Sequence, residues 1–418
     1  MDCKMEWPEP IVRVQSLSER GLAAIPTRYI KPPADRPSLT SGKLDGGVNI
    51  PLIDFEPLLA PGAPAAAKAE VLAQVSEACR SWGFFQAVNH GVPPELMDEA
   101  REIWRQFFHQ PMEVKQPYAN SPKTYEGYGS RLGVEKGAVL DWSDYYFLHY
   151  LPCSLKDHNK WPALPSSLRG LIEEYSEQVV KFCGELMKIL STNLGLKENV
   201  LQDAFGGENI GACLRVNFYP KCPSPDMTLG LSPHSDPGGL TILLPDQHVA
   251  GLQVRRNGEW VTVKPAAHAF IVNIGDQIQA GIVGRRGLFE VGSDIRTPGN
   301  KLVEYLIWRV DENICHYNIL DKEENDFCKM HLRPMILTNA IYKSVEHRVI
   351  VNSNKERVSL AYFYNPRSDL LIQPVKEVVT PENPALYPPM TFDEYRLYIR
   401  TKGPRGKLQL GESNKCED

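Results

Sequence analysis

Cys213-Leu214-Arg215-Val216-Asn217-Phe218-Tyr219 opens a series of short β-rich runs that continues through the second half of this 418-residue chain. Turns containing Gly and Pro separate the runs at intervals typical of an antiparallel sandwich or barrel. The pattern predicts a jelly-roll β-barrel of the cupin kind over residues 208–375. The later runs lie at 240–244, 252–254, 260–263, 269–274, 345–352 and 359–364.

Five segments outside this barrel have sequence patterns that predict flanking structure. The N-terminal segment is rich in Pro, Ser and Gly. A long segment before the barrel carries apolar residues about every four positions, as a helix does. Thr391 and Glu394 form a capping box near the C-terminal end. The expected fold class is therefore mainly β with flanking helices. The segments are an extended N-terminal arm (1–48), an N-terminal domain of mixed strands and helices (49–160), a long linking helix (161–200), a C-terminal helix (386–403) and a disordered polar tail (405–418).

The bulk composition excludes several classes of partner. Hydrophobic residues make up 42% of the chain and charged residues 23%, as in an ordinary globular protein. A net charge of −5 does not indicate the basic surface that nucleic-acid-binding proteins use. No apolar run in the sequence is long enough to cross a membrane. The nine cysteines are scattered and no secretory signal opens the chain, which fits reduced thiols in the cytosol. We therefore expect a cytoplasmic monomer, with the nucleus as a second compartment, that binds small molecules.

Two groups able to bind a metal stand close together in Ser232-Pro233-His234-Ser235-Asp236-Pro237. Side chains two residues apart share one face of a strand, so His234 and Asp236 can point the same way. His347, from a later strand, is the candidate third ligand. Two histidines and one carboxylate bind one face of Fe(II) and leave its other positions open for reactants. The His-x-Asp pattern alone is weak, and His234 as a capping residue in a turn is the alternative.

A possible anchor for a second reactant follows the third ligand. Arg357 and Ser359 lie on one face of a strand that begins ten residues after His347. A guanidinium and a hydroxyl together suit the far carboxylate of a dicarboxylic cosubstrate. Tyr219 would add a phenol from a neighbouring strand, although a tyrosine buried in the core is the simpler interpretation of that residue alone.

These motifs together resemble the plant Fe(II)- and 2-oxoglutarate-dependent oxygenase family. The turn Asn89-His90-Gly91 and the run Gly83-Phe84-Phe85 share the likeness. The resemblance implies a double-stranded β-helix and a hydroxylation that consumes O2 and 2-oxoglutarate and releases succinate and CO2. It also implies a role for each motif residue. Fe(II) would bind His234, Asp236 and His347, and 2-oxoglutarate would be held by Arg357, Ser359, Tyr219 and Asn217.

Three further stretches, at 7–17, 124–141 and 387–407, look like the jasmonate-induced oxygenases, which hydroxylate jasmonic acid at carbon 12. That likeness implies an acidic hormone as substrate and a damping of plant defence signalling. Arg396 and Arg400 lie four apart on the predicted C-terminal helix, and with Arg215 they could surround a substrate carboxylate. The alternative for the pair is a solvated helix face. Phe363 is expected to line the apolar part of the substrate site or to lie in the core.

The chain departs from these relatives between the second and third metal ligands. The gap is 347 − 236 = 111 residues, and the excess, 280–335, resembles nothing familiar apart from one β-like run at 302–308. This insert is interpreted as intron-derived sequence or as a surface excursion. Two other functions therefore remain open: the same chemistry on another small acid or phenolic, such as an auxin or flavonoid, and a binding protein whose catalysis the insert impairs.

Overall fold

The computed structural model describes residues 12–37, 48–120, 126–130, 138–279, 341–372 and 390–396, together with the backbone of three short strands between 290 and 317. A large and a small β-sheet make up the core, which confirms the predicted β-rich fold with flanking helices. The large sheet has the order β1 (Leu52–Asp54), β2 (Phe84–Val88), β10 (Phe270–Ile274), β7 (Leu240–Leu244), β15 (Arg357–Asn365), β5 (Gly211–Tyr219), β4 (Asp144–Leu151), β3 (Gly127–Ser130). The small sheet has the order β6 (Leu231–His234), β14 (His347–Val349), β8 (Leu252–Arg256), β9 (Glu259–Thr262).

The two central strands of the large sheet, β5 and β15, separate apolar from polar side chains. They pair antiparallel from Arg357↔Tyr219 to Asn365↔Gly211, so alternate residues of both strands share a face. Val216 and Leu360 face the main hydrophobic core. The opposite face approaches the small sheet, since a Cβ added to Gly230 would lie 2.6 Å from the Tyr219 ring. The polar face is therefore enclosed between the two sheets.

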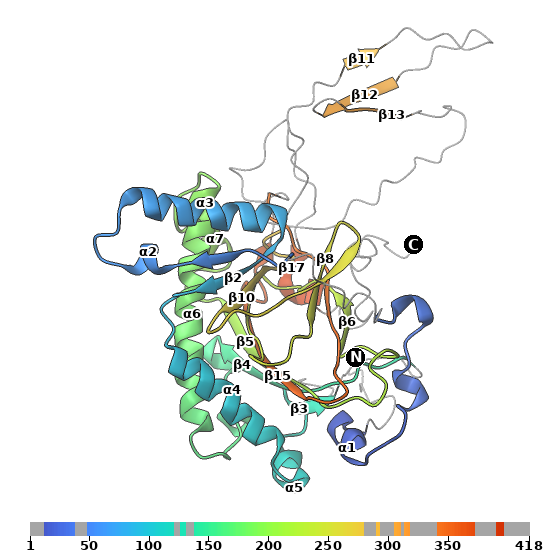
Figure 1. Cartoon of the computed structure of the whole chain (residues 1–418). Helices are drawn as coiled ribbons and strands as arrows, with labels where there is room; N and C mark the ends of the chain where they lie inside the picture. The colour runs from blue at the N-terminus through green and yellow to red at the C-terminus, as the bar shows by residue number, and fades with distance from the viewer. Residues whose placement is uncertain are drawn as a thin grey trace, which may run out of the picture.

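Three helices cover the apolar face of the large sheet, along one side of the molecule in Figure 1. They are α3 (Ala65–Ser81), α4 (Pro94–Phe108) and α6 (Leu168–Asn193), and α6 is the long helix that the periodicity predicts. Its buried stripe includes Tyr175, Val179 and Leu186, at the spacing of one helix face. No helix in the described part of the chain is long and apolar enough to span a membrane.

The described part of the N-terminal arm is folded, contrary to the expectation of extended backbone. It contains α1 (Val14–Glu19) and the short helical turns Thr27–Tyr29 and Pro33–Asp35. The backbone N–H groups of Val14 and Gln15 donate to the two carboxylate oxygens of buried Asp144, at 3.0 and 2.8 Å. This carboxylate from β4 satisfies the free N–H groups at the start of α1, and such a distant cap is invisible to local sequence patterns.

The C-terminal segment enters the description only over 390–396. Strand β17 (Met390–Thr391) pairs with β16 (Leu371–Ile372), and a helical turn follows over 392–396. Both hydrogen bonds of the predicted capping box are present, Glu394 N to Thr391 Oγ1 at 3.2 Å and Thr391 N to Glu394 Oε2 at 2.7 Å. The rest of the predicted helix and the tail over 405–418 lie outside the described residues.

The 280–335 insert also lies outside the described residues except for the backbone of three strands. These are β11 (Glu290–Gly292), β12 (Tyr305–Val310) and β13 (Asn313–Tyr317), which pair antiparallel in that order. Strand β12 overlaps the β-like run predicted at 302–308.

Candidate metal and cosubstrate site

The three predicted metal ligands come together where the strands of the small sheet meet. His234 ends β6, His347 begins β14, and these two residues are direct partners in the antiparallel ladder. Asp236 follows two residues after His234. One nitrogen from each histidine and one oxygen from Asp236 all lie within 4.8 Å of one another. Among the described residues, this is the one group of three His, Cys, Asp or Glu side chains close enough to share a metal.

Backbone carbonyls orient both imidazole rings. The Nδ1 atom of His234 lies 2.9 Å from the carbonyl oxygen of Ser232, and Nδ1 of His347 lies 3.1 Å from that of Val345. A carbonyl can only accept, so each Nδ1 carries the proton and donates, which leaves the Nε2 lone pair for a metal. The two Nε2 atoms lie 3.6 and 3.7 Å from Oδ1 of Asp236. The three metal-binding atoms, Nε2 of each histidine and Oδ1 of Asp236, therefore converge on one point.

The second carboxylate oxygen of Asp236 is held by two neighbours inside the barrel. Oδ2 accepts from Thr241 Oγ1 at 2.6 Å and from Asn273 Nδ2 at 2.7 Å. Burial tends to raise the pKa of Asp236, but the two imidazoles and these hydrogen bonds outweigh it and lower the pKa below its usual range. The Asp236 carboxylate is therefore ionised, and its Oδ1 atom points toward the two histidines and is available to bind a metal.

The protonation states at the centre suit a divalent metal. Burial, with the neighbouring His347, lowers the pKa of His234 to about 4, so that imidazole is neutral at physiological pH. Neutral imidazole and ionised carboxylate are the forms that bind metal. Two nitrogens and one oxygen on one face fit Fe(II) with open positions.

The predicted cosubstrate anchors lie side by side on the enclosed face. Arg357 is almost fully buried, its guanidinium lies 5.1 Å from the Tyr219 ring, and its Nη1 donates to Ser359 Oγ at 3.2 Å. The Nε–H of Arg357 is buried and has no hydrogen-bond partner among the described residues. A buried donor without an acceptor is costly, and a carboxylate would supply two acceptor oxygens to this guanidinium. The residues present therefore fit the far end of 2-oxoglutarate.

Tyr219 and Asn217 lie on the same enclosed face, and with Arg357 and Ser359 they form what we call the cosubstrate wall. Burial raises the pKa of Tyr219 although the charge of Arg357 acts to lower it, so the phenol keeps its proton and can donate to a carboxylate. Asn217 pairs with Ser359 across the two strands. Its Oδ1 accepts from Arg215 Nε at 2.8 Å, which ties it to the predicted substrate arginine.

The predicted substrate-binding residues are only partly brought together. Arg215 and Phe363 lie on the enclosed face with Arg357, and the guanidinium of Arg215 stacks over the Tyr145 ring at 4.3 Å. Arg396 instead pairs with Asp393 on its own helical turn, at 2.6 Å, and lies over the Phe392 ring. Arg400 lies outside the described residues. The carboxylate clamp therefore stays a prediction.

Several residues that support the site were not predicted from the sequence. Thr241 and Asn273 are polar residues at inward positions of strands that are otherwise apolar, and that signal could have identified them. Buried Asp276 accepts from Ser344 Oγ and Tyr395 OH, both at 2.7 Å, and so joins the segment before His347 to the C-terminal helical turn. Nothing local to the sequence marks these two contacts.

The N-terminal arm also reaches the metal centre. Lys31 Nζ donates to Asp141 Oδ1 at 2.7 Å and to Ser232 Oγ at 3.0 Å, and both charged groups are buried. The carbonyl of the same Ser232 orients His234. A buried ion pair of this kind fixes geometry more than it adds stability.

Comparison with known proteins adds independent information. Residues 50–164 match the family described as non-haem dioxygenase in morphine synthesis N-terminal, and residues 210–285 and 320–366 match the 2OG-Fe(II) oxygenase superfamily. The interruption at 286–319 falls inside the predicted insert. The chain is 58% identical over 405 residues to jasmonate-induced oxygenase 2 of Arabidopsis thaliana, covering 97% of this chain and 93% of that protein. It is 55% identical over 410 residues to jasmonate-induced oxygenase 1 of the same plant, covering 97% and 86%.

A solved structure agrees with these sequence matches. The crystal structure of JOX2 in complex with 2OG, Fe, and JA superposes with a TM-score of 0.78 at 56% sequence identity. The superposition covers 99% of this chain and 100% of that one.

Proposed function

Because this chain belongs to the 2OG-Fe(II) oxygenase superfamily, we propose that its substrate is jasmonic acid, hydroxylated at carbon 12. The observation that carries the proposal is the convergent His-Asp-His centre together with a buried arginine whose Nε–H has no partner among the described residues, in a chain more than half identical to the jasmonate-induced oxygenases. Removal of the hormone by this reaction would damp jasmonate defence signalling. We further propose that the enzyme acts as a cytoplasmic monomer.

The mechanism assigns one task to each part of the site. His234, Asp236 and His347 would hold Fe(II) on one face, and Arg357, Ser359 and Tyr219 would hold the far carboxylate of 2-oxoglutarate. Bound Fe(II) with O2 supplies the oxidative decarboxylation of 2-oxoglutarate to succinate and CO2, coupled to insertion of the second oxygen atom into a substrate C–H bond. Phe84 packs edge-on against His347 at 5.4 Å between ring centroids and covers that side of the ligand.

Substrate recognition is proposed to begin at Arg215. Its hydrogen-bond and ring partners are neutral, the side-chain oxygen of Asn217 and the Tyr145 ring, and no salt bridge among the described residues includes it. A partly enclosed guanidinium with only neutral neighbours favours an anionic ligand, because a carboxylate would restore its counter-charge. We propose that Arg396 and Arg400 extend this clamp from the C-terminal helix, with Arg396 exchanging Asp393 for the substrate. Phe363 would contact the apolar part of the same ligand.

Product analysis tests this proposal directly. The full chain is incubated with Fe(II), 2-oxoglutarate, O2 and, one at a time, jasmonic acid, its methyl ester, an indole acid and a flavonoid. We expect succinate and a singly hydroxylated product from jasmonic acid, with fragmentation that places the hydroxyl at carbon 12. Hydroxylation of another member of the panel in preference to jasmonic acid would overturn the substrate assignment. Absence of turnover with all four would favour a binding protein.

A further inference from the structure

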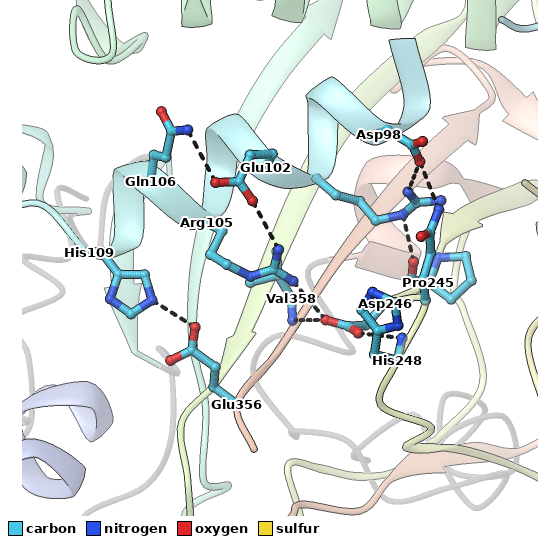
Figure 2. A network of polar contacts seen from close by, with 12 residues as sticks. Asp98, Glu102, Arg105, Gln106, His109, Pro245, Asp246, His248, Glu356 and Val358 are labelled. Atoms are coloured by element: carbon cyan, nitrogen blue, oxygen red, sulfur yellow. Dashed lines mark hydrogen bonds and ion pairs between the residues drawn. The ribbon is translucent and has the colours of Figure 1, made fainter. Parts of the chain in front are cut away.

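Asp246 is a buried carboxylate that no part of the proposed mechanism uses. Its Oδ1 accepts the backbone N–H groups of His248 and Val249, at 2.9 and 3.0 Å, and so closes the turn after β7. Its Oδ2 accepts from Arg105 Nη2 at 3.0 Å and from the backbone N–H of Val358 at 3.3 Å. Figure 2 shows Arg105 reaching from α4 to this carboxylate, with Val358 beside it. One side chain therefore joins a helix, a turn and the start of β15.

The contact with Val358 is made where the ladder between β7 and β15 ends. The last register pair there is Leu360↔Leu244, so β7 offers no residue opposite Val358. The carboxylate of Asp246 takes the place of the missing strand carbonyl and satisfies this buried N–H. Val358 lies between Arg357 and Ser359, the two cosubstrate anchors on β15.

The C-cap residue of helix α4 provides a second contact with the start of β15. His109 Nε2 lies 2.7 Å from Glu356 Oε1, on the residue that precedes Arg357. Figure 2 shows both connections, one through Arg105 and the other through His109. The residues on both sides of Arg357 are thus linked to α4 and its C-cap, Val358 through the Asp246 carboxylate and Glu356 through its own side chain. Arg105 also supplies the charge that a buried carboxylate such as Asp246 requires.

The arginine that this backbone carries has little room to move. A Cβ added to Gly251 would lie 3.1 Å from Cδ and 3.3 Å from Nε of Arg357. The Tyr219 ring lies on another side of the guanidinium, at 5.1 Å. A shift of β15 at Val358 would press the guanidinium against one of these neighbours or move it away from the cosubstrate. Displacement of an anchoring group by about 1 Å is enough to cost up to about 100-fold in catalysis.

We propose that Arg105 and Asp246 form a positioning pair, which fixes β15 at Val358 and thereby aims Arg357 and Ser359 at 2-oxoglutarate. The pair touches neither metal nor substrate, and acts through the backbone of β15. This inference rests on the role proposed for Arg357, and the experiment below separates the two.

The most informative variant is Asp246→Asn, which keeps the size of the side chain. Its carbonyl can still accept from His248 and Val249, but its NH2 group then faces the donors on Val358 and Arg105. We expect the Kd for 2-oxoglutarate, measured by anaerobic calorimetry on the Fe(II)-loaded chain, to rise roughly 5–30-fold. The KM for 2-oxoglutarate should rise in parallel, while the affinity for Fe(II) and the KM for the acid substrate stay constant.

A second variant and a control test the same helix. Arg105→Met removes the charge beside Asp246 and should raise the Kd for 2-oxoglutarate in the same direction by a smaller factor. It keeps the proposal testable if Asp246→Asn fails to fold. Glu102→Gln removes the negative charge of the exposed partner of Arg105 Nη1, at 3.2 Å, and leaves the contact with Asp246 in place. This control should bind 2-oxoglutarate as the parent does.

The double variant Asp246→Asn with Arg357→Met decides whether the pair acts through Arg357. We expect its Kd to match that of Arg357→Met alone, because the positioned group is already gone. Fully additive losses would overturn the proposal, as would equal losses in affinity for Fe(II), 2-oxoglutarate and substrate in Asp246→Asn. An unchanged Kd in Asp246→Asn beside a raised Kd in Arg357→Met would overturn the positioning pair and keep the anchor. An unchanged Kd in Arg357→Met would remove the anchor itself.

Discussion

The metal centre and the cosubstrate wall are supported by contacts of very different reach along the chain. The rings of His234 and His347 each donate to a carbonyl two residues earlier, and Asp236 accepts from Thr241, five residues later, and from Asn273, 37 residues later. Arg357 instead lies against the Tyr219 ring from another strand, and a helix more than two hundred residues earlier contacts the residue before it. The side chains of the metal ligands are thus oriented mainly by residues close to them in sequence, and Arg357 is positioned mainly by residues from distant segments.

This difference implies two kinds of response to mutation. A metal held by three ligands on one face is lost or unbalanced when any ligand goes, so the response at that centre should be close to all-or-none. A carboxylate held by several hydrogen-bond donors loses only part of its binding energy when one donor is removed. Graded changes in affinity should therefore be typical of the cosubstrate wall.

The largest effect is expected at the metal ligands. His234→Ala, Asp236→Ala or His347→Ala should each reduce turnover to below about 1% of the parent, beyond the 10–100-fold losses typical of groups that only support a ligand. Far-ultraviolet circular dichroism should show a folded protein, since each change lies at a strand end or within two residues of one. Metal content after gel filtration gives the second measurement. A variant that keeps parental turnover and metal content would show that its residue is not a ligand.

The next effect is graded and affects one reactant. Arg357→Met should raise the KM for 2-oxoglutarate roughly 10–100-fold, from the loss of about 1.5–3 kcal/mol of charge-assisted hydrogen bonding. The KM for the acid substrate should change little, because the unpartnered Nε of Arg357 is assigned to the cosubstrate. Lys31→Met changes the N-terminal arm and leaves the cosubstrate anchors in place. In this comparison variant the KM for 2-oxoglutarate should not rise more than the KM for the acid substrate. A rise in both KM values for Arg357→Met would assign this arginine a structural role.

The same difference in reach explains what the sequence could predict. His-x-Asp and Arg-x-Ser are short patterns whose geometry follows from strand alternation, so residues 234, 236, 357 and 359 could be located without a structure. The supports that join distant segments had no such signal. Asp144 caps α1, and Asp246 continues a ladder beyond the end of β7; each depends on packing between segments far apart in the chain. Over its described residues, 12–37, the arm was wrongly predicted to be extended, because its helical structure depends on such distant contacts.

A smaller effect is expected from the C-terminal arginines. Arg396→Ala combined with Arg400→Ala should raise the KM for jasmonic acid about 5–20-fold and change the KM for its methyl ester little, because only the acid offers a charge to pair. The factor is modest since Arg396 already pairs with Asp393 on a partly exposed surface. Arg215→Met should show the same preference for the ester. Equal changes for acid and ester would favour a solvated helix face.

The smallest effect is expected from removal of the insert, although it lies between Asp236 and His347. Gln279 and Ser344 flank the undescribed segment, and Ser344 N donates to the Gln279 side-chain carbonyl. Ser344 Oγ also donates to Asp276 at 2.7 Å. The two ends of the segment therefore meet at the barrel.

Deletion of 280–335 removes 56 residues (335 − 280 + 1) and leaves 64 − 56 = 8 between Gln279 and Ser344. Shortening the loop from 64 to 8 residues halves its length three times, and the shorter loop costs about 2 kcal/mol less to close. That gain is a substantial part of a typical free energy of unfolding of about 5–15 kcal/mol. We expect turnover at least equal to that of the full chain and a higher denaturation midpoint. A deletion of 286–319 alone, the stretch outside the family match, is the matched control and should behave in the same way. If both deletion variants lose turnover while still binding Fe(II), the insert is required for catalysis and the prediction is wrong.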